Sequence, residues 1–177
     1  MSRDVAIQLI GYVGMAFFLV SYQIKSNKAL FLCQLIGSFI FSVQLVLLHA
    51  YTGALSLAVN LLKNLLLFKS GDWEWVKSKK TMSVLLALLV IITIFTWDGP
   101  RSLLPCVAIA ATTIGYWTNN AQKIRASQLI GSPCYLVYDV IARSWAGALC
   151  ESIVIISVLV SIARFGWKNL GENTEFK

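Results

Sequence analysis

Charged residues divide the chain into long uncharged stretches. No Asp, Glu, Lys or Arg occurs within residues 5–24, 29–62, 81–97 or 102–122. A helix that crosses the hydrocarbon core of a bilayer needs about 20 mainly apolar residues, whereas runs of about 10–14 are more typical of buried helices in soluble proteins. The short alternating segments of membrane β-strands are absent. The pattern therefore predicts transmembrane helices.

The stretch 29–62 is too long for one crossing, so we expect it to break at its most polar point, the His-Ala-Tyr-Thr-Gly segment at 49–53. The predicted fold is an all-α integral membrane protein with seven membrane-spanning helices. We place these helices at 5–24, 29–49, 53–69, 81–97, 102–119, 125–143 and 146–164.

Composition and charge support this prediction. Apolar residues make up 58% of the chain and charged residues 13%, about half the usual charged share. With the N-terminus outside and the C-terminus in the cytoplasm, eleven of the 15 basic residues lie on the inner side and only Arg3, Arg101 and Arg143 on the outer side. This distribution follows the positive-inside rule. Topology therefore accounts for the net charge of +7, and we expect lipid, not nucleic acid, as the partner.

The chain also contains an internal sequence repeat. The segment Gln-Leu-Ile-Gly-Ser at 34–38 recurs at 128–132, an offset of 94 residues. At this offset, 12 of the 44 positions from Tyr22 to Leu65 are identical without a gap. Spans one to three therefore map onto spans five to seven.

The fourth span has no counterpart in this repeat. Three spans are an odd number, so a fourth crossing lets both copies face the same way in the membrane. We predict two parallel three-helix repeats joined by a linker helix, an arrangement established among transporters. The corresponding segments are a first repeat (1–70), an inner loop with the linker helix (71–100), a second repeat (101–166) and a C-terminal tail (167–177).

This architecture resembles the SWEET sugar transporters and the wider PQ-loop group, and the whole chain resembles the YgjV family of small bacterial inner-membrane proteins. The PQ-loop signature is Pro-Gln followed by a basic residue near the inner end of the first span. Residues 21–25, Ser-Tyr-Gln-Ile-Lys, keep the Gln and the Lys but carry Tyr22 in place of proline. The resemblance implies a hinge at Tyr22 and Gln23. Gly11, Gly14 and Pro105 are further hinge candidates.

Polar residues within the spans are candidates for a substrate or proton-coupling site, because ionisable side chains in hydrocarbon usually face the bundle interior. Asn60, Lys63 and Asn64 share one helix face through their i, i+3, i+4 spacing. Asp139 and Glu151 lie near the outer ends of the last two spans, within reach of a pair with Lys63. The alternatives are a structural pair that fixes helix register and mutual capping of Asp139 and Arg143. The resemblance to SWEETs implies that Asn60 binds sugar, although its repeat counterpart is Val154.

The repeated polar and small residues have a simpler interpretation. We expect Gln34, Ser38, Gln128 and Ser132 to bridge helices more than to bind substrate. Gly37 and Gly131 permit close helix packing in lipid.

Two function classes follow from these residues. The first is a small-solute transporter for a sugar, an amino acid or another small solute, with a proton as a further partner. The second is a non-transporting membrane scaffold or a regulatory subunit of a partner complex. An enzyme is not expected, because a lone His49 and no metal-ligand or nucleophile motif leave little chemistry. We expect no cofactor and no metal, and we expect the four cysteines to remain unpaired within the spans. The oligomeric state stays open, a homo-oligomer included.

Overall fold

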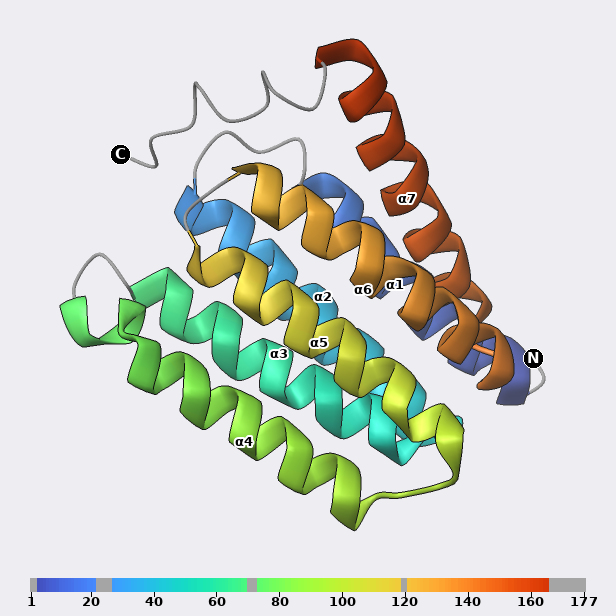
Figure 1. Ribbon diagram of the computed structural model, residues 1–177. Helices are drawn as coiled ribbons and strands as arrows, with labels where there is room; N and C mark the ends of the chain where they lie inside the picture. The colour runs from blue at the N-terminus through green and yellow to red at the C-terminus, as the bar shows by residue number, and fades with distance from the viewer. Residues whose placement is uncertain (1–2, 22–26, 70–72, 119–120, 166–177) are drawn as a thin grey trace.

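The computed structural model describes residues 3–21, 27–69, 73–118 and 121–165, and within them the protein is all-helical with no strand. Its seven α-helices are shown in Figure 1. They are α1 (Arg3–Ser21), α2 (Asn27–Leu47), α3 (Tyr51–Lys69), α4 (Lys79–Phe95), α5 (Leu103–Trp117), α6 (Ala121–Ile141) and α7 (Trp145–Phe165). Two short 3₁₀ turns, η1 (Glu74–Lys77) and η2 (Pro100–Ser102), precede α4 and α5.

The seven predicted helices are confirmed, and their ends lie within four residues of the predicted positions. The long apolar stretch breaks where its polar segment predicted, and α3 begins at Tyr51. The largest difference is at the start of α6, which begins at Ala121 where the prediction was residue 125. The helix includes one additional polar turn before its apolar part. By length and hydropathy alone, only α1 and α3 among the described helices satisfy the usual criterion for a membrane span.

Six of the helices pack side by side in chain order. In the first half α2 packs between α1 and α3, and in the second half α6 packs between α5 and α7. The halves meet where α1 contacts α7 and where α3 contacts α5. The remaining helix, α4, lies outside this arrangement against α3 and α5, as Figure 1 shows.

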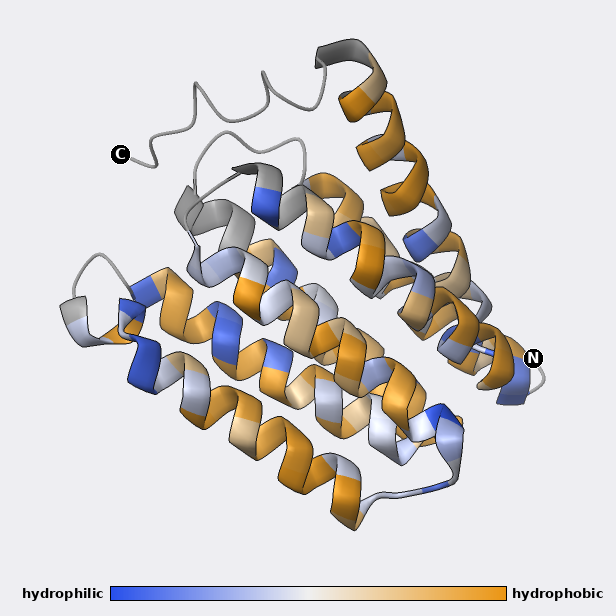
Figure 2. Ribbon diagram, viewed as in Figure 1, coloured by the Kyte–Doolittle hydropathy of each residue, from blue (hydrophilic) through white to orange (hydrophobic). Residues whose placement is uncertain are grey.

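Polarity is distributed in the opposite sense to that of a soluble protein. Large apolar side chains face outward, for example Phe95 on α4 with an exposed fraction of 84% and Ile156 on α7 with 61%. Polar side chains such as Gln44, Lys63 and Asp139 are buried. Figure 2 shows hydrophobic residues along most of α4, whereas hydrophilic positions interrupt α3 and α6 partway along their length. An exposed apolar surface of this extent is suited to lipid.

The α2–α3 and α6–α7 connections have the same backbone geometry. His49 and Arg143 both adopt positive φ, at 59° and 58°. The amide of Ala50 donates to the carbonyl of Leu45 at 2.9 Å, and the amide of Ser144 donates to the carbonyl of Asp139 at 2.8 Å. These are the hydrogen bonds of a Schellman cap, in which glycine usually occupies the left-handed position. Each of these positions is separated from its counterpart by 94 residues, although His49 and Arg143 differ in type.

The two caps are placed at the same end of the bundle, which we call the turn end. It carries the α2–α3, α4–α5 and α6–α7 connections. Here Gln8 of α1 joins the two halves, because its side-chain amide donates to the carbonyl of Arg143 at 2.7 Å and its oxygen accepts from the amide of Trp145 at 3.2 Å. At the other seam, the hydroxyl of Thr52 on α3 lies 3.3 Å from that of Ser102, which immediately precedes α5. Polar contacts thus hold both seams together at this end.

The left-handed position of Arg143 gives a prediction about stability. A non-glycine residue in this conformation costs about 1 kcal/mol, so Arg143→Gly should raise the free energy of unfolding by up to that amount. In a protein of this size the melting temperature of the purified protein in detergent should rise by roughly 2–4 °C. Arg143→Ala removes the guanidinium but keeps Cβ, so it should not stabilise. An equal rise for both variants would contradict the argument from backbone strain.

Candidate functional site

A cavity lies between the two halves of the bundle, and six helices contribute to its wall. Residues from α1, α2, α3, α5, α6 and α7 line it, and none comes from α4. Its volume is about 90 Å³. A buried water needs about 10–15 Å³ of such volume, so the cavity has room for several water molecules. Asn60, Lys63, Asp139 and Glu151 all line this one cavity.

The wall is built from equivalent positions of the two halves. Six pairs of lining residues are separated by 94 positions, namely Phe18 and Thr112, Gln34 and Gln128, Phe41 and Tyr135, Leu45 and Asp139, Leu57 and Glu151, and Asn60 and Val154. The cavity is therefore bounded by the same stretches of helix in each half. Its chemistry is not symmetric, since both carboxylates come from the second half where the first half has leucine.

Lys63 is buried at one end of the cavity with an aromatic ring as its neighbour. Its side chain is 3% exposed, and its ammonium nitrogen lies 4.7 Å from the centroid of the Tyr116 ring. At this distance the face of the ring attracts the cation, by about 2 kcal/mol when both are away from water. The Tyr116 hydroxyl in turn faces the side chains of Gln34 and Gln128. Lys63 is thus positioned from α3 by a residue of α5.

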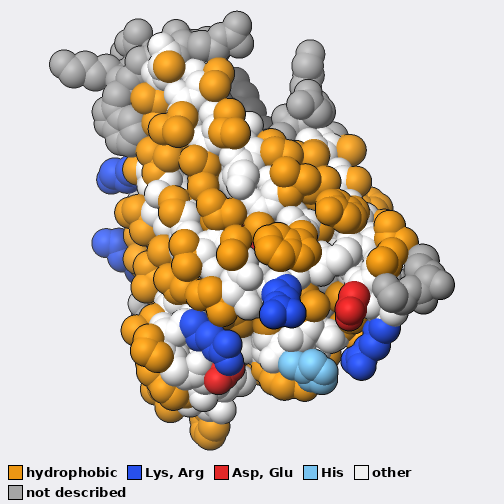
Figure 3. Space-filling view, turned by 90° about the vertical axis from the view of Figure 1, so that its right-hand side faces the viewer, with side chains coloured by type: hydrophobic (Ala, Val, Ile, Leu, Met, Phe, Trp, Pro, Cys, Tyr) orange, Lys and Arg blue, Asp and Glu red, His pale blue; other side chains and the backbone are white. Residues whose placement is uncertain are grey.

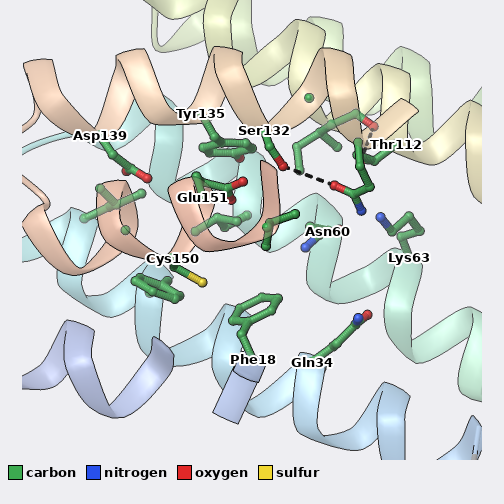
Figure 4. Close-up of a pocket in the computed structure, with 18 of the residues that line it drawn as sticks. Phe18, Gln34, Asn60, Lys63, Thr112, Ser132, Tyr135, Asp139, Cys150 and Glu151 are labelled. Carbon is green, nitrogen blue, oxygen red and sulfur yellow. Dashed lines mark hydrogen bonds between the residues drawn. The ribbon is translucent and has the colours of Figure 1, made fainter. Parts of the chain in front are cut away.

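The carboxylates of Asp139 and Glu151 line the part of the cavity that lies away from Lys63, as Figure 4 shows. Glu151 lies near Ser132 and Tyr135, and its carboxylate faces the Ser132 hydroxyl. Asp139 lies at the far end from Lys63. Asp139 packs closely against Gly147, where a Cβ would approach its carboxylate carbon to 2.7 Å. The glycine thus makes room for the carboxylate.

Two ion pairs that the sequence left open do not form. Lys63 pairs with neither Asp139 nor Glu151 within 4.0 Å, because the carboxylates lie further along the cavity and the lysine instead contacts Tyr116. Asp139 and Arg143 do not cap each other, since the left-handed turn leaves Arg143 exposed while Asp139 is buried. Among the described residues, the ion pair that forms joins Asp98 and Arg101 in the α4–α5 connection.

Of the other polar candidates, some bridge helices and some face the cavity. The amide of Asn60 donates to the hydroxyl of Ser38 at 3.2 Å, which links α3 to α2. The hydroxyl of Ser132 donates to the side-chain oxygen of Gln128 at 3.4 Å within α6. Gln34 and Gln128 both line the cavity. Asn64 is buried but does not line it.

The glycine candidates lie where helices cross closely. A Cβ at Gly37 would meet the carbonyl oxygen of Gly14 at 3.2 Å, and a Cβ at Gly131 would meet that of Ala108 at 3.1 Å. Ala108 is the position 94 residues after Gly14, so α1 crosses α2 as α5 crosses α6. Gly37 and Gly131 thus lie at close helix crossings, where a side chain would not fit without movement of the neighbouring backbone.

The proposed hinge residues have other roles in this structure, or lie outside it. Gly14 packs at the α1–α2 crossing, and Gly11 packs against the side chain of Gln44. Helix α1 continues through both glycines without a break. Pro105 is the third residue of α5, where its missing amide hydrogen costs no helical hydrogen bond. Tyr22 and Gln23 lie outside the described residues.

A second, wider hollow of about 820 Å³ opens at the turn end. Its wall includes His49, Arg101 and Tyr138. Figure 3 shows this face of the molecule, where charged side chains and the one histidine gather on the lower part below a largely apolar surface. In the wall of this hollow, the hydroxyl of Tyr138 accepts a hydrogen bond from the amide of Gly53 at 2.8 Å. This contact joins α6 to α3 across the two halves.

Three residues of the site were not predicted from the sequence. Tyr116 is the repeat counterpart of Tyr22, and its contact with Lys63 depends on how α3 packs against α5. Tyr135 lines the cavity with a hydroxyl that has no hydrogen-bond partner. Pro133 lies inside α6 beside this wall, so the helix lacks one of its hydrogen bonds there. In the sequence, Pro133 is the feature that indicates an irregular stretch of α6 at this wall.

Comparison with known proteins identifies the family. Residues 5–169 match the Imp-YgjV family of bacterial inner membrane proteins, and the chain belongs to this family. No significant similarity to a curated protein or to a solved structure was found. The described residues contain no group of three or more His, Cys, Asp and Glu side chains that could hold a metal ion. The protein is therefore a bacterial inner membrane protein with a polar cavity inside its helical bundle.

The contact between Lys63 and Tyr116 can be tested by a double-mutant cycle. Tyr116→Leu should destabilise the protein while Lys63 is present, and the effects of Tyr116→Leu and Lys63→Met should be coupled by about 1–2 kcal/mol, the strength of a desolvated cation–π contact. The measurement is the free energy of unfolding in detergent for the single and double variants. Tyr116→Phe keeps the ring and should keep most of the coupling. Strictly additive effects of Tyr116→Leu and Lys63→Met would show that the contact contributes nothing.

Proposed function

We propose that this inner membrane protein transports a small solute and that the cavity between its halves is the substrate site. The observation that carries the proposal is that Asn60, Lys63, Asp139 and Glu151 line one interior cavity. A dry, tightly packed bundle with these side chains facing outward would instead favour a scaffold or regulatory subunit. Charged side chains inside a membrane bundle commonly mark a substrate or ion pathway.

The proposal includes a duplicated architecture of the SWEET and PQ-loop type. In it, α1–α3 and α5–α7 are parallel repeats and α4 is the linker that keeps the second copy upright. Three observations support the repeat beyond the sequence identities. The caps at His49 and Arg143 share their geometry, the Gly14–Gly37 crossing is equivalent to the Ala108–Gly131 crossing, and the cavity wall contains six pairs of equivalent positions.

Alternating access then follows from movement of one half against the other. Within each half the helices cross at glycine and pack closely, so each half can move as a unit. At the turn end the halves are joined by a few polar contacts, among them the Gly53–Tyr138 hydrogen bond beside the hollow. In the proposed movement this contact breaks, and a path opens from the hollow towards the cavity. This mechanism needs no proline hinge in α1 and is consistent with the unbroken helix.

The orientation of the chain is also part of the proposal. The turn end carries Arg3, Arg101 and Arg143, and the opposite end carries Lys69, Lys77, Lys79, Lys80 and Lys123. The positive-inside rule therefore favours a turn end outside the cell and a C-terminus in the cytoplasm. A reporter fused to the N-terminus and found in the cytoplasm would contradict this orientation.

Transport can be tested with the purified protein in proteoliposomes. Thermal-shift screening against sugars, amino acids and organic cations first identifies solutes that stabilise the protein, and uptake of those solutes is then measured. Lys63→Ala and Glu151→Ala should each reduce uptake by about tenfold or more, because a lost hydrogen bond to a charged group costs about 1.5–3 kcal/mol.

The matched control is Lys69→Ala, which removes a lysine from the same helix but outside the cavity. It should leave uptake unchanged. If both cavity variants transport every solute as the wild type does, the cavity is not the substrate site. If no solute binds to or crosses with the wild type, the transport proposal fails and a non-transporting role is favoured.

A further inference from the structure

The cavity separates charges of opposite sign. Lys63 lies at one end and Asp139 at the other, with Glu151 between them, as Figure 4 shows. The three side chains come from α3, α6 and α7, so one cation of the first half faces two carboxylates of the second half across the cavity. No ion pair within 4.0 Å joins the lysine to either carboxylate.

A charge without a counter-ion is costly in an interior of low dielectric constant. The wall compensates each charge only in part. Lys63 has the Tyr116 ring, and Glu151 faces the Ser132 hydroxyl, whose single proton is shared between this carboxylate and the side-chain oxygen of Gln128. The wall therefore provides a cationic end and an anionic end, and the part of the protein that the structure describes supplies no ion-pair partner for either end.

The wall also contains an unused hydrogen-bonding group. Tyr135 is 8% exposed, and its hydroxyl has no hydrogen-bond partner among the described residues. Buried polar atoms are nearly always paired with protein or water. Tyr135 lies beside Glu151 in the cavity wall, and its buried hydroxyl remains available as a hydrogen-bond donor there.

The volume limits the size of that occupant. At about 10–15 Å³ for each water-sized position, the cavity of about 90 Å³ has room for roughly six to nine water molecules. Its occupant is therefore a small solute. A neutral solute would also leave all three charged side chains without counter-charges, and a solute with a single charge would leave one end uncompensated.

We propose that the cavity binds a small zwitterionic solute, with its carboxylate toward Lys63 and its ammonium toward Glu151 and Asp139. This inference rests on the proposed transport function and names the substrate class of the same site. One molecule of this kind places a counter-charge at each end of the cavity, with its single ammonium facing both carboxylates. The side chains of Gln34, Asn60 and Gln128 add polar groups to the wall.

The test compares zwitterions with their singly charged counterparts. Glycine, β-alanine and 4-aminobutyrate carry the two charges at increasing separation, and each is matched by the acid and the amine of the same carbon chain, with glucose as a neutral solute. Binding to the full-length purified protein is measured by calorimetry. At least one zwitterion should bind about tenfold or more tightly than its own acid and amine. Equal binding of a singly charged counterpart would overturn the inference.

Variants that each remove one charge test which end of the cavity binds the carboxylate of the solute and which binds its ammonium. Lys63→Gln should weaken binding of the zwitterion by about tenfold or more and leave binding of the matched amine unchanged. Glu151→Gln should weaken the zwitterion similarly and leave binding of the matched acid unchanged. The controls, Lys69→Gln and Asp4→Asn, change charges outside the cavity and should leave every affinity unchanged. Uniform weakening of all ligands by either cavity variant would contradict the assignment.

The outcomes separate this inference from the transport proposal. If glucose or another neutral solute binds and is taken up while no zwitterion does, the transport proposal stands and the zwitterion inference is wrong. If the wild-type protein neither binds nor takes up any solute, both fail. Should a cavity variant fail to fold, the comparison of ligands on the wild-type protein alone still decides the substrate class.

Discussion

The absence of water from the hydrocarbon core is the constraint on which this structure depends. Backbone amides and carbonyls must find partners within each segment, which leaves helices as the spanning element. Charged side chains must likewise turn away from lipid. The chain satisfies both conditions by placing apolar residues outward and by enclosing Lys63, Asp139 and Glu151 between the two halves of the bundle. A polar cavity is the result.

Close helix packing makes this enclosure possible. Hydrophobic burial does not drive helices together in lipid, so association relies on close contact at small residues and on polar bridges. Gly37 and Gly131 bring α2 and α6 against α1 and α5, and Asn60 bridges α3 to α2 through Ser38. The contacts between the halves at the turn end are polar. Close packing at glycine within each half, and hydrogen bonds between the halves, are the physical basis for treating each half as a unit in the transport proposal.

Sequence patterns predicted the helices well and the contacts of the site only in part. Stretches without charge predicted α1, α2, α4, α5 and most of α3, since both lipid and helix geometry act locally along the chain. Helices α6 and α7 were predicted although Asp139, Arg143 and Glu151 interrupt their apolar stretches. The i, i+3, i+4 spacing placed Asn60 and Lys63 on one helix face, and the cost of a charge in lipid indicated that this face is turned to the interior. The neighbours of Lys63 were not predictable in this way. Whether it meets Tyr116 or a carboxylate depends on how α3 packs against α5 and α7, which local spacing does not determine.

The central claim is that the polar cavity is reached by water as part of a transport path. The most direct measurement uses Cys150, which lines the cavity, in a variant whose other cysteines, Cys33, Cys106 and Cys134, are replaced by alanine. A small charged thiol reagent is applied to the protein in its membrane, and modification of Cys150 is followed over time. The account predicts modification in the folded protein. Reaction of Cys150 only after denaturation would show a sealed interior and contradict it.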